Sequence, residues 1–221
     1  MEQSAVDEMI AWQGAVRLEN VAKALIARGF EAEVCATRDE ARTQILVAAE
    51  TAKTIGFGGS LSVACLNVTR DLSSAGKEIL NHGFKDLTPD ERMEIMRRQL
   101  TCDLFLSSVN ALTDDGIIVN VDGIGNRVAS MTFGPHQVLL IVGRNKVVRG
   151  SVSAALNRIR EVAGPINCYR LGRKTPCAIT GVCADCAGVC PESICRVTSI
   201  IRQRPGWTPI RVLLVNEDLG L

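Results

Sequence analysis

The chain has 221 residues, of which 47% are hydrophobic and 22% are charged, so it can bury a substantial core as one domain or as a domain with an appendage. Lys and Arg number 25 against 24 Asp and Glu, and aromatic residues make up only 4% of the chain. Because there is no surplus of positive charge to hold phosphates and few rings to stack on bases, this composition argues against a nucleic-acid partner.

The first twelve residues, MEQSAVDEMIAW, are acidic and contain neither a basic lead nor an apolar stretch of signal-peptide length. No run of about 18 uninterrupted apolar residues occurs anywhere in the chain. We therefore expect a cytoplasmic protein that does not span a membrane.

The first fifty residues carry the pattern of two helices with a strand between them. Apolar residues three and four apart predict a helix over residues 15–26, which Gly29 would end. Alternating apolar and acidic residues predict an edge strand at residues 30–34. Thr37 and Glu40 have the spacing of a capping box, so a second helix is expected to begin there.

A short strand at residue 54 runs into Gly58, Gly59 and Ser60, a loop without bulky side chains that suits the close approach of a ligand. Residues 61–68 are expected to be helical, and residues 78–84 irregular or a short strand. The sequence TPDE at residues 88–91 combines a capping threonine, a proline at the first helical position and a capping-box glutamate. It predicts a helix over residues 89–100.

Small and polar residues are densest between Ser107 and Arg127. An apolar run at residues 104–106 ends in Ser107, Ser108 and Asn110, and open α/β sheets place their ligands at such strand ends. A predicted turn at residues 114–116 leads into a β-branched segment, and the sequence DGIGNR at residues 122–127 forms a second polar loop. The two polar loops predict a binding site.

The remaining pattern alternates helices and strands. Residues 128–131 complete a helix that Gly134-Pro135 would break, and the continuous apolar run at residues 138–142 is typical of a strand buried on both faces. Ser151 caps a helix that is expected to end at Gly164-Pro165, and strands are expected at residues 200–201 and 212–215. We therefore predict an α/β fold: an open, three-layer, Rossmann-like and mainly parallel sheet with helices on both faces.

Five of the nine cysteines crowd into the C-terminal region, which favours metal chemistry inside the cell over a secreted disulfide framework. Their positions are Cys177, Cys183, Cys186, Cys190 and Cys195. Thiolates suit zinc or iron–sulfur clusters, and a CxxC pair brings two sulfurs to one centre. The last three cysteines of the bacterial ferredoxin run are reproduced from Cys183 to Pro191, but Thr180 stands where its first cysteine would be.

Other interpretations of the cysteines remain open. They could be free thiols on a loop, or Cys183 and Cys186 could form a thioredoxin-like redox pair, although no evident strand-to-helix unit precedes them. Neither His82 nor His136 lies in the cluster to decide between zinc and an iron–sulfur cluster, and the latter is the first expectation. The remaining cysteines are expected to be small buried hydrophobes: Cys35, Cys65, Cys102 and Cys168.

From about residue 54 onward the chain resembles the LUD domain, the lactate-utilisation protein C family. The resemblance rests on five segments, residues 107–127, 133–135, 142–146, 163–167 and 175–186. It implies the fold of the sugar-phosphate isomerase and CoA-transferase superfamily. It also implies that the loops at residues 58–60 and 122–127 face a phosphorylated or acyl ligand, and that iron–sulfur proteins of L-lactate oxidation are partners.

In the cysteine-bearing branch of that family, the matching pattern implies Cys177, Cys183, Cys186 and Cys195 as metal ligands. Cys190 is an extra cysteine here, so the fourth ligand stays open between Cys190 and Cys195. The chain is expected to form a single LUD-like domain with an N-terminal helical part (1–53), a core ligand-binding sheet (54–168), and a cysteine-rich loop with the final strands (169–221).

The functional interpretation of the polar loops is that they bind a small anionic metabolite, a carboxylate or a phosphate. Asp122 could act as an acid or base, or orient Arg127. The alternative is that the Asn and Asp residues only stabilise turns and that Arg127 and Lys146 are solvated charges. The expected ligand-binding residues are Gly58, Gly59, Ser60, Ser108, Asn110, Gly123, Gly125, Asn126, Arg127 and Lys146.

Three hypotheses about function follow. The first is a component of 2-hydroxy-acid oxidation that binds a small anion and carries a cysteine-ligated metal or iron–sulfur site. The second is a stand-alone isomerase or transferase, acting on a phosphorylated or CoA-linked substrate, with a structural zinc. The third is a non-catalytic subunit whose cysteine loop docks on an electron-transfer partner.

Overall fold

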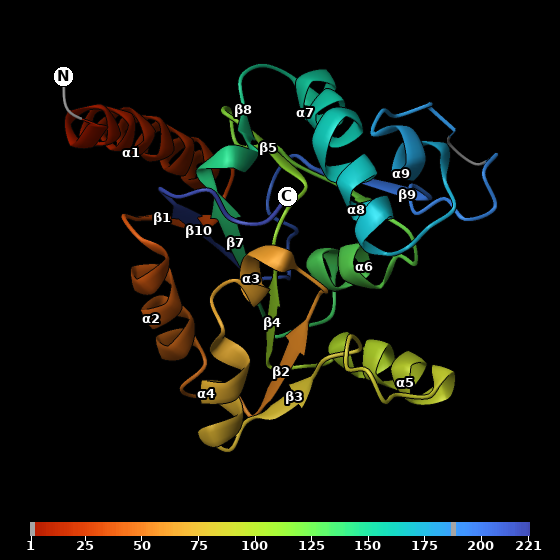
Figure 1. Ribbon diagram of the computed structural model, residues 1–221. Coiled ribbons are helices and arrows are strands. Elements are labelled where there is room, and N and C mark those ends of the chain that lie inside the picture. The colour runs from red at the N-terminus through yellow and green to blue at the C-terminus, as the bar shows by residue number, and fades with distance from the viewer. Residues whose placement is uncertain (1–2, 187–188) are drawn as a thin grey trace.

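The apolar runs of the sequence form a central sheet in which six strands pair in parallel. The computed structural model describes residues 3–186 and 189–221, and within them the sheet has the order β1-β10-β7-β4-β2-β3 (Figure 1). The strands are β1 (Glu31–Cys35), β2 (Thr54–Phe57), β3 (Glu78–Leu80), β4 (Leu104–Ser107), β7 (Gln137–Gly143) and β10 (Ile210–Val215). The predicted edge strand at residues 30–34 is confirmed as β1.

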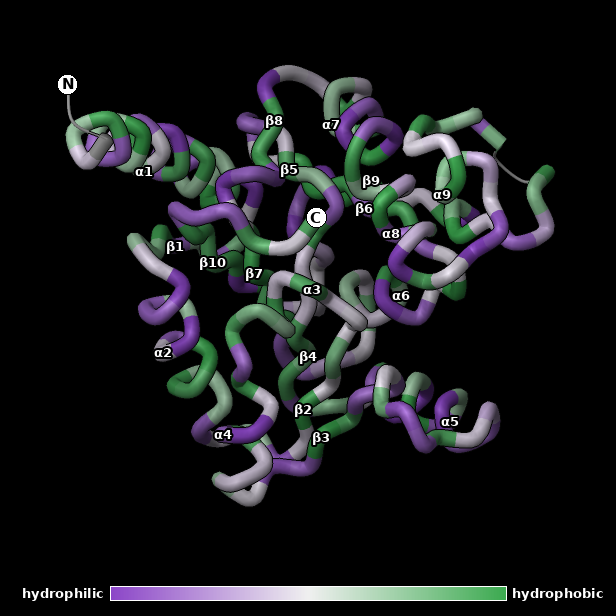
Figure 2. Tube along the Cα trace, in the orientation of Figure 1, coloured by the Kyte–Doolittle hydropathy of each residue, from purple (hydrophilic) through white to green (hydrophobic). Residues whose placement is uncertain are grey.

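Both faces of the sheet are covered because the central strands send apolar side chains to both sides. In β4, Leu104 and Leu106 pack into the core on one face and Phe105 into the core on the other. The first face is covered by α2 (Arg38–Ala48), α3 (Leu61–Ala64) and α4 (Val68–Ser74), and the second by α1 (Gln3–Ala27), α5 (Pro89–Gln99) and α6 (Asn126–Thr132). The predicted three-layer α/β fold is confirmed. Hydrophobic residues gather along β7 and β10, whereas hydrophilic residues interrupt the surrounding helices (Figure 2).

A second sheet, which the sequence did not predict, packs on the α1 side of the first. Its order is β8-β5-β6-β9, with antiparallel pairing of β6 to both β5 and β9 and parallel pairing of β5 to β8. Its strands are β5 (Ala111–Thr113), β6 (Ile118–Asp122), β8 (Val147–Val148) and β9 (Val197–Ile201). The polar stretch from Ser107 to Arg127 therefore leaves the central sheet after β4 and enters the second sheet.

A long helical segment covers the outer face of the second sheet. It consists of α7 (Val152–Arg158), the π-helical turn η2 (Ile159–Ala163) and α8 (Gly164–Arg170). The predicted end of this helix at Gly164-Pro165 is wrong. The N–H of Gly164 donates to the carbonyl of Ile159, five residues back, and this wider π turn lets the helix continue through a proline that has no N–H to donate.

The boundaries of the other helices differ less from those predicted from the sequence. Helix α1 begins at Gln3, twelve residues before the predicted start. The helix expected over residues 61–68 divides into α3 and α4, because Asn67 adopts a left-handed φ of 51° between them. The capping box at Thr88 and Glu91 is confirmed at the start of α5.

Two short helices complete the fold, η1 (Arg144–Lys146) after β7 and α9 (Pro176–Thr180) in the cysteine-rich region. Helices α7, α8 and α9 gather beside β9 at one end of the molecule (Figure 1). Among the helices of residues 3–186 and 189–221, none combines the length and the apolar character that a bilayer crossing requires.

Candidate functional site

The strand order of the central sheet reverses between β2 and β4, since the chain passes from β2 outward to β3 and returns to β4 on the other side of β2. Open α/β sheets bind ligands at the carboxyl ends of the strands that flank such a switch point. Here Gly58 follows β2, and Ser107 ends β4. A Cβ on Gly58 would lie 2.6 Å from Ser107 Oγ, so the loop reaches this position only because residue 58 has no side chain.

A pocket of about 50 Å³ opens at this switch point, and we call it the strand-end pocket. Its volume is enough for a few water molecules or for one carboxylate or phosphate group. The structure brings together six of the residues that the sequence predicted for ligand binding: Gly59, Ser60, Ser108, Asn110, Arg127 and Lys146. Six further residues complete the lining: Leu61, Val109, Ala163, Asn167, Arg170 and Leu221.

Lys146 forms the buried floor of the strand-end pocket and is only 4% exposed. It follows β7 in the short helix η1, and its Nζ donates to Ser108 Oγ at 2.9 Å and to the carbonyl oxygen of Val109 at 3.1 Å. Burial, together with the nearby Arg158 and Arg127, lowers the pKa of Lys146 to about 7. The alternative interpretation of Lys146 as a solvated charge is therefore wrong.

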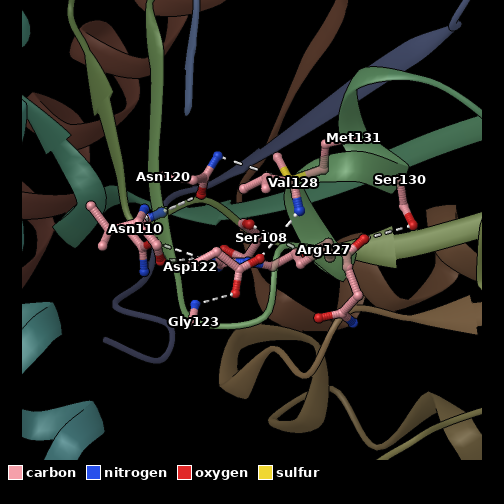
Figure 3. Close-up of polar contacts among 12 residues, drawn as sticks. Ser108, Asn110, Asn120, Asp122, Gly123, Arg127, Val128, Ser130 and Met131 are labelled. Atoms are coloured by element: carbon pink, nitrogen blue, oxygen red, sulfur yellow. Dashed lines mark hydrogen bonds and ion pairs between the residues drawn. The ribbon is translucent and has the colours of Figure 1, made fainter. Parts of the chain in front are cut away.

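Arg127 is held at the pocket wall by a network of short-range contacts (Figure 3). Its Nη2 donates to Asn110 Oδ1 at 2.9 Å and to the carbonyl oxygen of Val121 at 2.8 Å, and its Nε lies 3.7 Å from Asp122 Oδ2. Asn110 Oδ1 also accepts from the N–H of Val121 at 2.9 Å. These contacts fix the guanidinium where β5, β6 and α6 meet.

Asp122 is outside the lining of the strand-end pocket. Its Oδ1 accepts from the N–H of Gly123 at 2.9 Å, and its Oδ2 accepts from the N–H of Val128, in the first turn of α6, at 3.2 Å (Figure 3). A carboxylate in this position satisfies a helix N–H that has no partner within its own helix, and it positions Arg127.

Four predicted ligand residues also lie outside the pocket lining: Gly58, which packs against Ser107, and three residues of the DGIGNR loop. Gly123 packs against Ile194, and Gly125 adopts a φ of 97° directly before α6. Asn126 donates to Gln99 Oε1 at 3.5 Å. The DGIGNR loop thus contributes one pocket residue, Arg127, while its other members shape the turn.

A histidine that sequence reasoning did not assign to the site lies on the far side of the glycine loop. His82 follows β3, and a Cβ built on Gly59 would lie 3.5 Å from His82 Nε2. The fully buried Gln99 lies with its Nε2 at 3.0 Å from His82 Nδ1 and also donates to Phe57 and Leu80. Burial, aided by Arg92, lowers the pKa of His82, so the neutral ring is favoured. The position of His82 after a strand was the signal that could have pointed to it.

A second and larger pocket, of about 120 Å³, lies in the cysteine-rich region, and we call it the cysteine pocket. Five thiols line it, those of Cys168, Cys177, Cys183, Cys186 and Cys195. The four cysteines predicted as metal ligands are all among them, whereas Cys190 is not. Among the described residues, no three Cys, His, Asp or Glu side chains converge on a point that could hold a single metal ion.

Cys168 is the member of this group that sequence reasoning missed. It lies on α8 and is buried, and burial raises its pKa to about 11. The prediction that Cys168 is buried is confirmed, although its thiol lines the cysteine pocket, and the same prediction is wrong for Cys65, which is exposed. The neighbouring Cys177 lies at the start of α9, and its Sγ is 3.3 Å from Thr175 Oγ1. The nine-residue separation of the two cysteines matches no ligand motif, and only the packing of α8 against α9 brings them together.

A family model of the LUD domain matches residues 18–215. The chain belongs to the LUD domain family. Among solved structures, a DUF162 family protein from Deinococcus radiodurans is similar, with 13% sequence identity, a TM-score of 0.53, and coverage of 91% of this chain and 98% of that one. At this identity the likeness shows the fold alone. A search of curated proteins finds no match.

In this LUD domain, one helix separates the two pockets. Ala163, Asn167 and Arg170, three or four residues apart, line the strand-end pocket, while Gly164 and Cys168 line the cysteine pocket. An α-helix with its side chains is about 10–12 Å across, so the two pockets lie about that far apart. The η2–α8 segment is thus a shared wall.

Proposed function

We propose that this LUD-family protein is a component of L-lactate or other 2-hydroxy-acid oxidation. In this proposal the strand-end pocket binds the small carboxylate, and the cysteine pocket carries an iron–sulfur cluster that exchanges electrons with iron–sulfur partner proteins. The observation that carries the proposal is the shared wall: an anion-sized basic pocket and a pocket lined by five thiols lie on two sides of one helix.

The strand-end pocket supports the anion half of the proposal by its charge and donors. Arg127 and Arg170 both line it, and the protonated fraction of Lys146 adds a third cation. Ser60 and Ser108 add hydroxyls, and the pocket is too small for a large ligand. Guanidinium groups match the two oxygens of a carboxylate, so a small carboxylate is the ligand class that these residues favour.

The thiols of the cysteine pocket suit zinc or an iron–sulfur cluster, and the way they are spread favours the cluster. Six side chains that can ligate a metal line this pocket, namely five thiols and the carboxylate of Asp185, and no histidine is among them. A single zinc ion needs four donors around one point, and the described side chains do not converge in that way. A cluster spreads its thiolate ligands over several iron atoms, and when bound it supplies one-electron redox chemistry.

Predicted ligands are Cys177, Cys183, Cys186 and Cys195. Regular elements flank the first and the last of these ligands, since Cys177 lies within α9 and Cys195 lies two residues before β9. The pocket partly buries Cys195, and the neighbouring thiols Cys183, Cys177 and Cys186 add to burial in raising the pKa of Cys195. A cationic metal centre would lower the pKa of these thiols and hold them as thiolates.

The test is anaerobic purification followed by iron, acid-labile sulfide and zinc analysis and an absorption spectrum. The proposal predicts a brown protein with a broad band near about 400 nm and with iron and sulfide in similar amounts. The Cys177→Ser variant should lose the band. A Cys65→Ser variant is the matched control, because Cys65 is exposed and outside the cysteine pocket.

Two outcomes would count against the proposal. A colourless protein with about one zinc per chain would favour a structural metal site and the isomerase or transferase alternative. A metal-free protein that folds normally would remove the cluster from the proposal altogether.

A further inference from the structure

The amine of Lys146 has a chemical environment that anion binding alone does not explain. It is buried at the floor of the strand-end pocket, and its hydrogen-bond partners are a hydroxyl and a carbonyl, both uncharged. Among the described residues, no carboxylate lies within ion-pair distance of its Nζ. A buried ammonium without a counter-ion is costly, so the protein favours the neutral amine.

Two arginines near Lys146 act in the same direction as burial and lower its pKa, whereas the thiol of Cys65 acts against them. Arg127 of α6 and Arg158 of α7 both face it, while the thiol of Cys65, after α3, is the acidic group nearby. Arg158 is occupied by the carbonyl oxygens of Asn145 and Asn110, at 2.9 and 2.6 Å. A desolvated lysine beside other cations is the usual arrangement of a nucleophilic amine, which must have a free lone pair at neutral pH.

We propose that Lys146 is a nucleophile that forms an imine with the carbonyl carbon of a small 2-oxo carboxylate bound in the strand-end pocket. The inference rests on the proposed function for its ligand class, since a 2-oxo acid is the product of 2-hydroxy-acid oxidation. It goes beyond that function because it assigns covalent chemistry to the site.

The pocket supplies what this step requires. Arg127 and Arg170 hold the carboxylate, while Nζ of Lys146 attacks the adjacent carbonyl carbon. A bond forms between nitrogen and carbon, and the carbon–oxygen bond breaks. The oxygen leaves as water, taking both hydrogens of the amine, so that no oxidant or reductant is consumed. Ser108 Oγ, 2.9 Å from Nζ, is placed to relay a proton from the nitrogen to the departing oxygen.

The experiment uses pyruvate as the probe and borohydride as the trap. Borohydride reduces an imine to a stable secondary amine, so Lys146 should gain the mass of one carboxyethyl group, which peptide mass spectrometry locates. Because the neutral amine reacts, initial labelling should increase several-fold as the pH rises from about 6 to about 8, through a pKa of about 7.

Two substitutions provide the comparison. Lys146→Arg keeps the positive charge but has no amine that can form this imine, so labelling should be lost while the fold, checked by thermal unfolding, is retained. Lys85→Arg, at an exposed lysine, should label like the wild type. A second readout needs no reductant: the imine acidifies the methyl hydrogens of pyruvate, so the wild type should speed their exchange with D₂O and Lys146→Arg should not.

Calorimetry with pyruvate separates this inference from the proposed function. Binding without labelling or methyl exchange would overturn the imine and leave the anion site standing. Absence of both binding and labelling would contradict the imine and the anion site together. Labelling that is spread over surface lysines, or that persists in Lys146→Arg, would also contradict a nucleophilic Lys146.

Discussion

Arg127 and Lys146 carry the same formal charge at the strand-end pocket, but their surroundings give them different properties. Arg127 is bound to Asn110 and Val121 and lies beside a carboxylate, whereas Lys146 has only uncharged partners and two cationic neighbours. A guanidinium stays protonated under these conditions, and a buried amine does not. Arg127, like Arg170, is therefore a permanent charge of the pocket, and Lys146 is a titratable group.

The first prediction concerns that permanent charge. Arg127→Ala should weaken the binding of a small carboxylate by about 1.5 to 3 kcal/mol, the scale of a hydrogen bond to a charged group. Isothermal titration calorimetry with L-lactate and pyruvate measures it. Arg97→Ala is the control, because Arg97 is exposed on α5, lies outside the lining of the strand-end pocket, and places its guanidinium 3.8 Å from the exposed Glu94. Equal affinities in the wild type and Arg127→Ala would remove Arg127 from the site.

The second prediction concerns stability and pH. Above pH of about 7 the folded chain releases the proton of Lys146, while the unfolded chain keeps it up to its ordinary pKa of 10.5. The unfolded state thus binds more protons in this window, and the free energy of unfolding should rise with pH by up to about 1.4 kcal/mol per unit through this group.

Lys146→Met removes the titrating group and is the reference for that measurement. The free energy of unfolding of the wild type, relative to that of Lys146→Met, should increase from pH 7 to pH 10. Below about pH 6 the difference between the two proteins should not change with pH. Denaturant unfolding across this range measures the difference. A difference that does not change with pH would show that Lys146 titrates normally.

At the scale of elements, the helix α7–η2–α8 connects the two pockets. The sequence predicted its end at Gly164-Pro165, because proline ends most helices. The π turn removes that conflict, and it also places Cys168 on the wall of the cysteine pocket. A single π turn, with its hydrogen bond from residue i to residue i−5, leaves no periodic signal in a short segment. The sequence therefore could not predict that the helix continues past Pro165 or that Cys168 lines the cysteine pocket.

The third prediction tests the close approach of β2 and β4. A Cβ on Gly58 would meet Ser107 Oγ at 2.6 Å and Phe105 Cζ at 3.0 Å, so Gly58→Ala should destabilise the protein by about 1–3 kcal/mol. Gly206→Ala, at a position with open space around it, should change the stability by less than about 0.5 kcal/mol. Denaturant unfolding compares the two, and equal stabilities would contradict the packing of the glycine loop.

The fourth prediction addresses the open choice between two cysteines. Cys195 lines the cysteine pocket and Cys190 does not, so Cys195→Ser should lose most of its iron and sulfide and Cys190→Ser should keep them. Metal analysis after anaerobic purification of both variants decides between them. Retention by Cys195→Ser with loss by Cys190→Ser would assign the fourth ligand to Cys190.

For the whole molecule, local patterns predicted the central sheet well. Capping boxes, glycine stops and apolar runs mark β1, β2, β4, β7 and β10 and the helices between them. The second sheet escaped prediction because β5 and β8 have three and two residues, too few for a period to be read. The pairing of β6 with β9 could not be read from local patterns either, because these two strands are more than seventy residues apart in the chain.

In the candidate site, too, local patterns predicted some residues, whereas the roles of others depend on tertiary packing. The glycine loop and Ser108 were predicted because each follows a strand of the central sheet and strand ends meet at one edge, whereas Lys146 was predicted from the family resemblance over residues 142–146. Asp122 was predicted as an acid or base, but its hydrogen bonds to Gly123 and Val128 depend on how β6 meets α6. Cys168 was missed because tertiary packing alone brings α8 to α9.

The central claim is that a small carboxylate and a cluster occupy the two sides of one helix, and one measurement tests both sites at once. The reduction potential of the anaerobically purified protein is measured by spectroscopic titration with and without saturating pyruvate. A negative charge about 10–12 Å away should make reduction harder and shift the potential by roughly 30–60 mV to more negative values, and Arg127→Ala should need a higher pyruvate concentration, in proportion to its weakened binding, to reach the same shift. A protein without a cluster, or a potential that pyruvate leaves unchanged, would contradict the account.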